Sequence, residues 1–144
     1  MPTISVAKRA TPIPGDGNDR AQFSSRWLWP TTAMVSATGE LDAANAAEFT
    51  DYGLEHVRTD GKLVLDLSAV TFFGAACFAS LHTVNVRCVG ENVDWVLIPS
   101  KAVSRVLRIC DPDAALPTSS DATAALSSLR TEPRPLQLVA KEID

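Results

Sequence analysis

The sequence of 144 residues is long enough for one domain with its own hydrophobic core, without disulfide bonds or a structural metal. Its hydrophobic content of 46% and its charged content of 21% are ordinary for a globular protein. The formal net charge is −4 and the lysines and arginines are scattered. This argues against general nucleic-acid binding, which needs a basic surface that displaces counterions.

The cysteine content and the apolar segments indicate a cytoplasmic protein. The number of cysteines is odd and none forms a CxxC pair, so we interpret all three, Cys77, Cys88 and Cys110, as reduced thiols. The N-terminal residues contain basic side chains but no apolar run after them, and no signal peptide is predicted. No segment approaches the roughly 18 apolar residues of a membrane helix, so we expect no direct membrane contact.

Composition divides the chain into three parts. Residues 1–22 are rich in Pro, Gly and Asp without periodicity, and we interpret them as a flexible N-terminal arm. Residues 131–144 contain two prolines and are predicted to form a C-terminal tail. The folded domain is then expected to span residues 23–130.

Within this domain the apolar pattern predicts alternating strands and helices. Short apolar or aromatic runs predict strands at Phe23–Trp29, Thr32–Ala37, Lys62–Leu67, Val93–Ile98 and, at one edge, Ala115–Pro117. Apolar spacings of three and four predict helices after Asp42, over Gly74–Val89, from Pro99-Ser100, and after a cap at Ser120 or Asp121. This order indicates an α/β fold with a mixed, mostly parallel sheet of about five strands and about four helices.

The same spacings predict which side of each helix faces the core. The inward residues are expected to be Ala43, Ala47, Thr50, Leu54 and Val57 in the first helix; Cys77, Leu81, Val84 and Cys88 in the second; Val103, Val106, Leu107 and Cys110 in the third; and Ala122, Ala125, Leu126 and Leu129 in the fourth.

Two motifs placed on these elements resemble the STAS domain, the fold of bacterial anti-sigma factor antagonists. Gly39-Glu40-Leu41-Asp42 precedes the first long helix, and the segment DLSAVTFFGAAC, residues 66–77, joins the third strand to the second helix. The typical family segment reads Asp-Leu-Ser, two residues, a small polar residue, Phe, an apolar residue, and Asp-Ser-Ser-Gly-Leu. This chain matches it through Phe73 and departs from it at Gly74.

The resemblance implies a protein-binding function without a cofactor. The partner would be an anti-sigma factor, possibly of the serine-kinase type. The implied contact residues are Asp42, Thr71, Phe73, Gly74, Ala75, Ala76, Cys77 and Phe78. The serine that the family's kinase phosphorylates falls on Ala75, which has no hydroxyl. The chain is therefore either a constitutive antagonist or a scaffold in another signalling or transport assembly.

Several of these residues have a second, structural interpretation. Asp42 is also a good helix cap, and Phe78 could be a core aromatic instead of an anchor for a partner. Cys77 could be a redox sensor near a helix N-terminus, although a buried apolar role is favoured. Ser68, Thr71 and Ser80 are alternative phosphosites, with Ser68 and Thr71 more typical of hydroxyls that satisfy local backbone groups.

Enzymatic and metal-dependent functions are disfavoured. The chain has no GxSxG nucleophile motif, no GxGxxG motif and no P-loop. His56 and His82 form no ligand pattern with a cysteine, so no metal site is expected.

Overall fold

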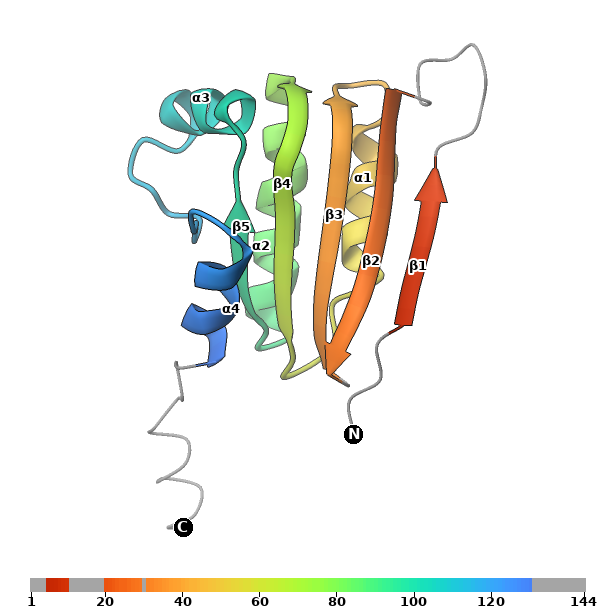
Figure 1. Cartoon of the computed structure of the whole chain (residues 1–144). Coiled ribbons are helices and arrows are strands. Elements are labelled where there is room, and N and C mark those ends of the chain that lie inside the picture. The colour runs from red at the N-terminus through yellow and green to blue at the C-terminus, as the bar shows by residue number, and fades with distance from the viewer. Residues whose placement is uncertain (1–4, 11–19, 30, 131–144) are drawn as a thin grey trace, which may run out of the picture.

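The computed structural model describes residues 5–10, 20–29 and 31–130, and its centre is a five-stranded sheet (Figure 1). The strands are β1 (Ser5–Ala10), β2 (Ala21–Trp29), β3 (Thr32–Leu41), β4 (Lys62–Phe73) and β5 (Asp94–Ile98), and they lie side by side in chain order. The pairings β1–β2 and β2–β3 are antiparallel, whereas β3–β4 and β4–β5 are parallel. The sheet is therefore mixed, as predicted, although only half of its pairings are parallel.

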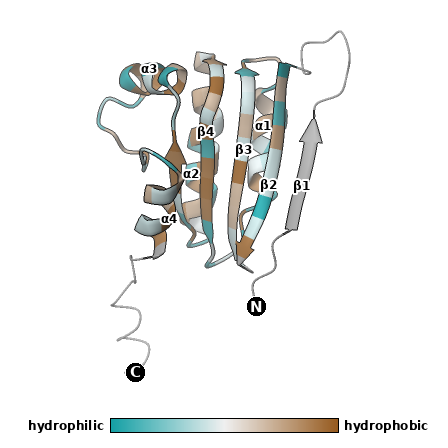
Figure 2. Ribbon diagram, in the orientation of Figure 1, coloured by the Kyte–Doolittle hydropathy of each residue, from teal (hydrophilic) through white to brown (hydrophobic). Residues whose placement is uncertain are grey.

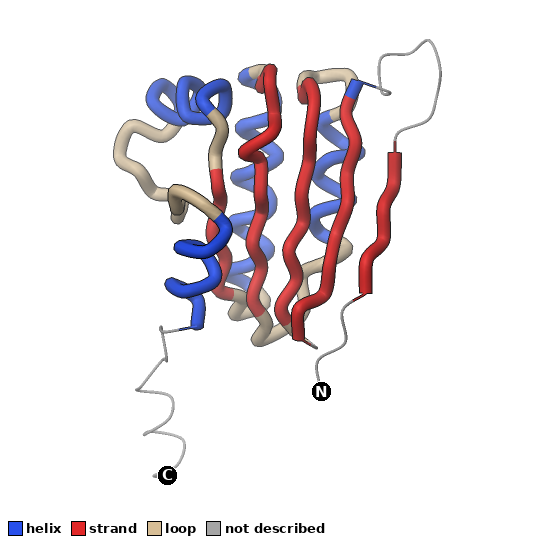
Figure 3. Tube along the Cα trace, in the orientation of Figure 1, coloured by secondary structure: helices blue, strands red, loops and turns tan. Residues whose placement is uncertain are grey.

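Helices cover both faces of this sheet, and α3 lies at its upper end (Figures 1 and 3). The helices are α1 (Ala46–Leu54), α2 (Phe78–Gly90), α3 (Lys101–Cys110) and α4 (Ala122–Arg130), with a 3-10 turn η2 at Ala75–Cys77. The crossover helices α1 and α2 lie together on one face, and α4 lies against β4 and β5 on the other. The predicted α/β architecture with four helices is confirmed.

The larger core lies between the sheet and the layer of α1 and α2. Alternate residues of each central strand point into it, among them Phe23, Val35, Leu65 and Leu97. The predicted inward face of α2 is confirmed, because Cys77, Leu81, Val84 and Cys88 are all buried there. Figure 2 shows the brown apolar residues concentrated in the central strands.

A smaller apolar cluster lies on the opposite face, where α4 covers the parallel half of the sheet. Val64, Val96 and Ile98 pack there against Ala125 and Leu129. Residues 63–65 and 95–98 are thus buried on both faces, which is the reason for the uninterrupted apolar runs in β4 and β5. Of the two caps predicted for α4, Ser120 or Asp121, the structure shows Asp121, whose carboxylate accepts a hydrogen bond from the Ala124 amide at 2.8 Å.

One predicted strand is wrong, and the sheet obtains its fifth strand elsewhere. Ala115–Pro117 is not a strand, because the carboxylate of Asp111 accepts the backbone amides of Ala115 and Leu116, at 2.9 and 3.0 Å. Only an isolated bridge, Leu97 with Thr118, joins this segment to β5. The fifth strand is β1, which lies within the predicted arm of residues 1–22 and pairs with β2. The predicted tail, 131–144, lies outside the described residues.

Two predicted helix faces also need correction. Helix α1 begins at Ala46 and buries Phe49, Tyr52 and Gly53, whereas Ala43 and Ala47 are exposed. The late start rotates the inward face, because the preceding residues form a turn and not the first helical turn. In α3, Val103 is buried as expected, but Cys110 is exposed at the last turn.

Candidate functional site

The candidate site forms where β3 and β4 end side by side. The parallel register pairs Glu40 with Phe72 and Leu41 with Phe73, so the residues after both strands emerge together. The Gly74 amide donates to the Leu41 carbonyl at 2.8 Å. A Cβ on Gly74 would lie 3.4 Å from the Asp42 Cα. The two sequence motifs, 32 residues apart at Asp42 and Gly74, are therefore in direct contact.

The segment after β4 turns sharply before it becomes a helix. Gly74 is extended, with φ −76° and ψ 154°, and the Cys77 amide then donates to the Gly74 carbonyl at 2.9 Å. This closes the 3-10 turn η2, and α2 begins only at Phe78, four residues later than predicted. No side chain caps this turn. As a result Ala75 and Ala76 are both presented at the surface.

Burial separates the predicted contact residues into two groups. Thr71, Ala75 and Ala76 are exposed, and Gly74 and Asp42 are half-buried. Phe73 and Cys77 are 4% and 0% exposed. These two side chains hold the loop onto the core, so the direct partner contact predicted for them is a prediction that their burial disfavours. Phe78 is half-buried and packs against the core.

Asp42 takes part in a charged cluster that the sequence patterns did not indicate. Its carboxylate accepts the Ala44 amide at 2.9 Å and pairs with the guanidinium of Arg20, which also bonds to Glu40 at 3.0 Å. The hydrogen bond from Arg20 lowers the pKa of Asp42. Because α1 begins at Ala46, Asp42 closes the preceding turn and is not the helix N-cap. Arg20 reaches it only through the pairing of β2 with β3.

Phe72 is the exposed aromatic of the site, and the sequence interpretation passed over it in favour of Phe73 and Phe78. Its side chain is 51% exposed, and its Cε2 atom lies 3.6 Å from where a Cβ on Gly74 would be. The strand alternation of β4 is interrupted, since the pairing with β3 shifts twice, between Ser36 and Thr38 and between Gly39 and Glu40. We define the motif surface as Arg20, Glu40, Asp42, Phe72, Ala75 and Ala76.

The hydroxyl groups near the motif surface differ in their exposure to solvent. Ser80 is 4% exposed, and its Oγ lies 2.7 Å from the Thr50 hydroxyl and donates to the Ala46 carbonyl at 3.3 Å. It is therefore closed to a kinase. Thr71 is exposed and donates to the Gly39 carbonyl at 3.2 Å, and exposed Ser68 donates to Asp66 at 2.6 Å.

The geometry gives little support to a redox-active thiol, a metal site or a membrane-spanning helix. Burial raises the pKa of the Cys77 thiol to about 11, which opposes a role as a redox-sensing thiolate. Within the described residues, no three His, Cys, Asp or Glu side chains are grouped so that they could hold a metal ion. In the same part of the chain, no helix combines the length and the apolar character needed to cross a bilayer.

Comparisons with known proteins agree with the fold. A family model described as "Mlab, STAS domain" matches residues 29–117. Osmosensory protein A of Mycobacterium tuberculosis is 29% identical over 106 residues, or 72% of this chain, and the match spans just under two thirds of that relative, 66%.

Two solved structures are also similar to this chain. An anti-sigma factor antagonist from Mycobacterium paratuberculosis has a TM-score of 0.63 and 20% identity, over 88% of this chain and 95% of that one. A STAS-domain antisigma-factor antagonist from Rhodobacter sphaeroides has a TM-score of 0.44 and 13% identity, over 72% and 94%. The first likeness shows a shared fold.

Proposed function

Because the chain belongs to the STAS-domain family, we propose that it acts by binding another protein, that it has no catalytic activity, and that its partner is an anti-sigma factor. The fold shared with a solved anti-sigma factor antagonist supports the choice of partner. The observation that carries the proposal is the motif surface, where exposed Phe72 lies beside the Arg20–Asp42 pair. Binding would capture the anti-sigma factor and release its sigma factor.

The motif surface has the composition of a small protein interface. Phe72 offers a large aromatic side chain of the kind that dominates binding energy in interfaces. Ala75 and Ala76 are exposed and small, so a partner backbone can approach closely. Arg20, Glu40 and Asp42 supply charged groups at the margin, where they favour orientation and association rate more than affinity.

We further propose that this binding is not switched by phosphorylation at position 75. In the family a phosphate at that position adds up to two negative charges at the interface and disrupts docking. Alanine cannot accept the phosphate, and buried Ser80 offers no substitute nearby. Unless the exposed hydroxyl of Thr71 or Ser68 takes a phosphate instead, the protein would therefore remain in its binding state.

Isothermal titration calorimetry with purified candidate anti-sigma factors tests the proposal. The variant Ala75→Glu places a permanent charge on the motif surface, and Thr123→Glu places the same charge on the exposed side of α4 as a control. We expect the wild type and Thr123→Glu to bind equally and Ala75→Glu to bind at least about tenfold more weakly, because a charge without a partner is desolvated in the interface. Equal binding by all three, or binding by none, would overturn the proposal.

A second candidate function is a scaffold in a signalling assembly without a sigma factor. The similarity to a protein named Osmosensory protein A favours this alternative. It predicts that tagged protein co-purifies with a sensor or transport complex in wild-type cells, and that its deletion leaves sigma-dependent transcription unchanged. A transcription defect together with recovery of an anti-sigma factor would decide against it.

A further inference from the structure

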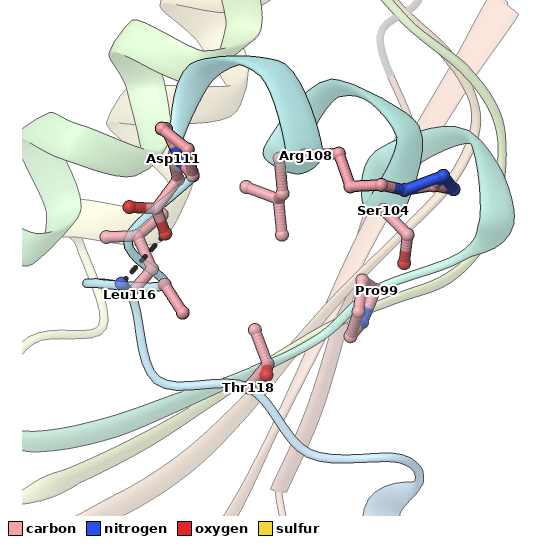
Figure 4. Close-up of a pocket in the computed structure, with 9 residues that line it drawn as sticks. Pro99, Ser104, Arg108, Asp111, Leu116 and Thr118 are labelled. Carbon is pink, nitrogen blue, oxygen red and sulfur yellow. Dashed lines mark hydrogen bonds between the residues drawn. The ribbon is translucent and has the colours of Figure 1, made fainter.

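A cavity away from the motif surface lies between α3 and the loop that follows it (Figure 4). Its volume is about 360 Å³, within the range of pockets that hold small ligands. Pro99, at the carboxyl end of β5, forms one wall. In open α/β sheets this end of the strands is the usual place for ligands. The apolar lining includes Leu107 of α3 and Leu116 of the loop.

The loop that closes this cavity is held in place by Asp111. One carboxylate oxygen accepts the Ala115 amide at 2.9 Å, and the other accepts the Leu116 amide at 3.0 Å, the bond drawn in Figure 4. The Asp111 carbonyl also accepts the Ala114 amide at 2.9 Å. The cavity is thus preformed, and the one carboxylate that the described residues place in its wall is already occupied by backbone donors.

The other polar side chains in the wall can all donate hydrogen bonds, and they have no acceptor among the residues that the structure describes. Ser104, Arg108 and Thr118 line the cavity, and none of their side chains bonds to another group in the described part of the chain. Figure 4 shows Arg108 extending along α3 toward Ser104, on the side opposite Asp111. One side of the cavity therefore carries a positive charge beside the Ser104 hydroxyl, the Asp111 carboxylate lies on the opposite side, and the wall between them is largely apolar.

We propose that this cavity binds a small carboxylate with an apolar body. The carboxylate accepts hydrogen bonds from the Arg108 guanidinium and the Ser104 hydroxyl, and the apolar body lies against Leu107 and Leu116. A neutral ligand would gain no charge-assisted hydrogen bond from the guanidinium, and a cation would be repelled by it. A bare inorganic anion would gain nothing from the apolar wall.

Titration of the ¹⁵N-labelled full chain with hexanoate, followed by amide chemical shifts, tests this site. We expect saturable shifts confined to residues 99–118, and at least about tenfold weaker binding of hexan-1-ol, which has the same chain without the charge. The variant Arg108→Gln should weaken hexanoate binding about tenfold, because hydrogen bonds to charged groups are of that strength. Arg105→Gln, an exposed arginine of α3 that does not line the cavity, should bind as the wild type does.

Three results would overturn the proposal: shifts that do not saturate or that lie outside residues 99–118, equal binding of hexanoate and hexan-1-ol, or equal loss in Arg108→Gln and Arg105→Gln. Both arginines are exposed, so the variants should keep the wild-type amide spectrum without ligand, which shows directly that they are folded.

Discussion

Replacing Gly39 with alanine should destabilise the protein by about 3 kcal/mol, through a strained backbone and a broken hydrogen bond. Gly39 lies opposite Ala21 in the β2–β3 pairing and has a φ of 93°, in the left-handed region. An added Cβ would be 2.1 Å from the Arg20 carbonyl oxygen and 3.2 Å from the Ala21 Cα. Both contacts are with backbone atoms, so the two strands must separate to admit the methyl group.

The magnitude follows from two costs. The left-handed conformation costs a residue with a side chain about 1–2 kcal/mol. Relief of the overlap breaks at least one hydrogen bond of the β2–β3 ladder, which costs about 1 kcal/mol or more. The sum is about 3 kcal/mol, and in a chain of this size it lowers Tm by about 10 °C. Movement of Arg20 would also disturb its pairing with Asp42 on the motif surface.

Urea unfolding followed by tryptophan fluorescence measures this loss. Gly90→Ala is the control, since the added Cβ at the end of α2 would have nothing within 4 Å apart from its chain neighbours and the backbone of its own helix. That variant should be neutral or more stable by up to about 1 kcal/mol, because alanine favours the helix. If the free energy of unfolding of Gly39→Ala is less than about 1 kcal/mol below that of Gly90→Ala, the inference that β2 approaches β3 closely at this position is wrong.

Three further predictions follow from single side chains. Phe72→Ala should weaken partner binding, measured by calorimetry, at least about tenfold. Its free energy of unfolding should change by less than about 1 kcal/mol, because Phe72 is exposed and contributes to the interface more than to the core. A loss of stability without a loss of binding would contradict this prediction. Asp42→Asn should be slightly less stable at pH 7. Because the folded pKa of Asp42 lies below its ordinary value of 3.8, this difference is present above 3.8 and disappears as pH falls through the folded value, which acid titration of both proteins would reveal. A thiol reagent should modify exposed Cys110 rapidly in the native protein. Cys77 and Cys88, buried with pKa values raised to about 11 and about 12, should react only after unfolding, and rapid modification of two thiols would refute their burial.

The parts of the fold that follow local rules could be predicted from the sequence. The face of α2 formed by Leu81, Val84 and Cys88 follows from helical periodicity, and the cap at Asp121 from its side-chain chemistry. The long apolar runs around Val64 and Val96 indicate strands covered on both sides. These features depend on residues near one another in the chain.

The predictions from sequence that were wrong concern places where distant segments compete for the same backbone groups or the same surface. The amides of Ala115 and Leu116 bond to Asp111 and not to β5, so the predicted edge strand does not form. Residues 5–10 have a weak strand signal but pair along β2. Two shifts in the β3–β4 pairing turn Val70 inward and Thr71 outward, against the alternation set by Leu63, Leu65 and Leu67, and no spacing within β4 reveals these shifts.

The sequence by itself determined the alternation of strands and helices, the motifs that carry the resemblance to the STAS domain, and the absence of a hydroxyl at position 75. Each depends on residue identity or on short-range periodicity. Only the tertiary structure decided that Arg20 pairs with Asp42, that Phe72 is the exposed aromatic, and that Ser80 is buried. The physical reason is that strand register and helix packing bring together residues separated by 20 or more positions, and these contacts leave no local pattern in the chain.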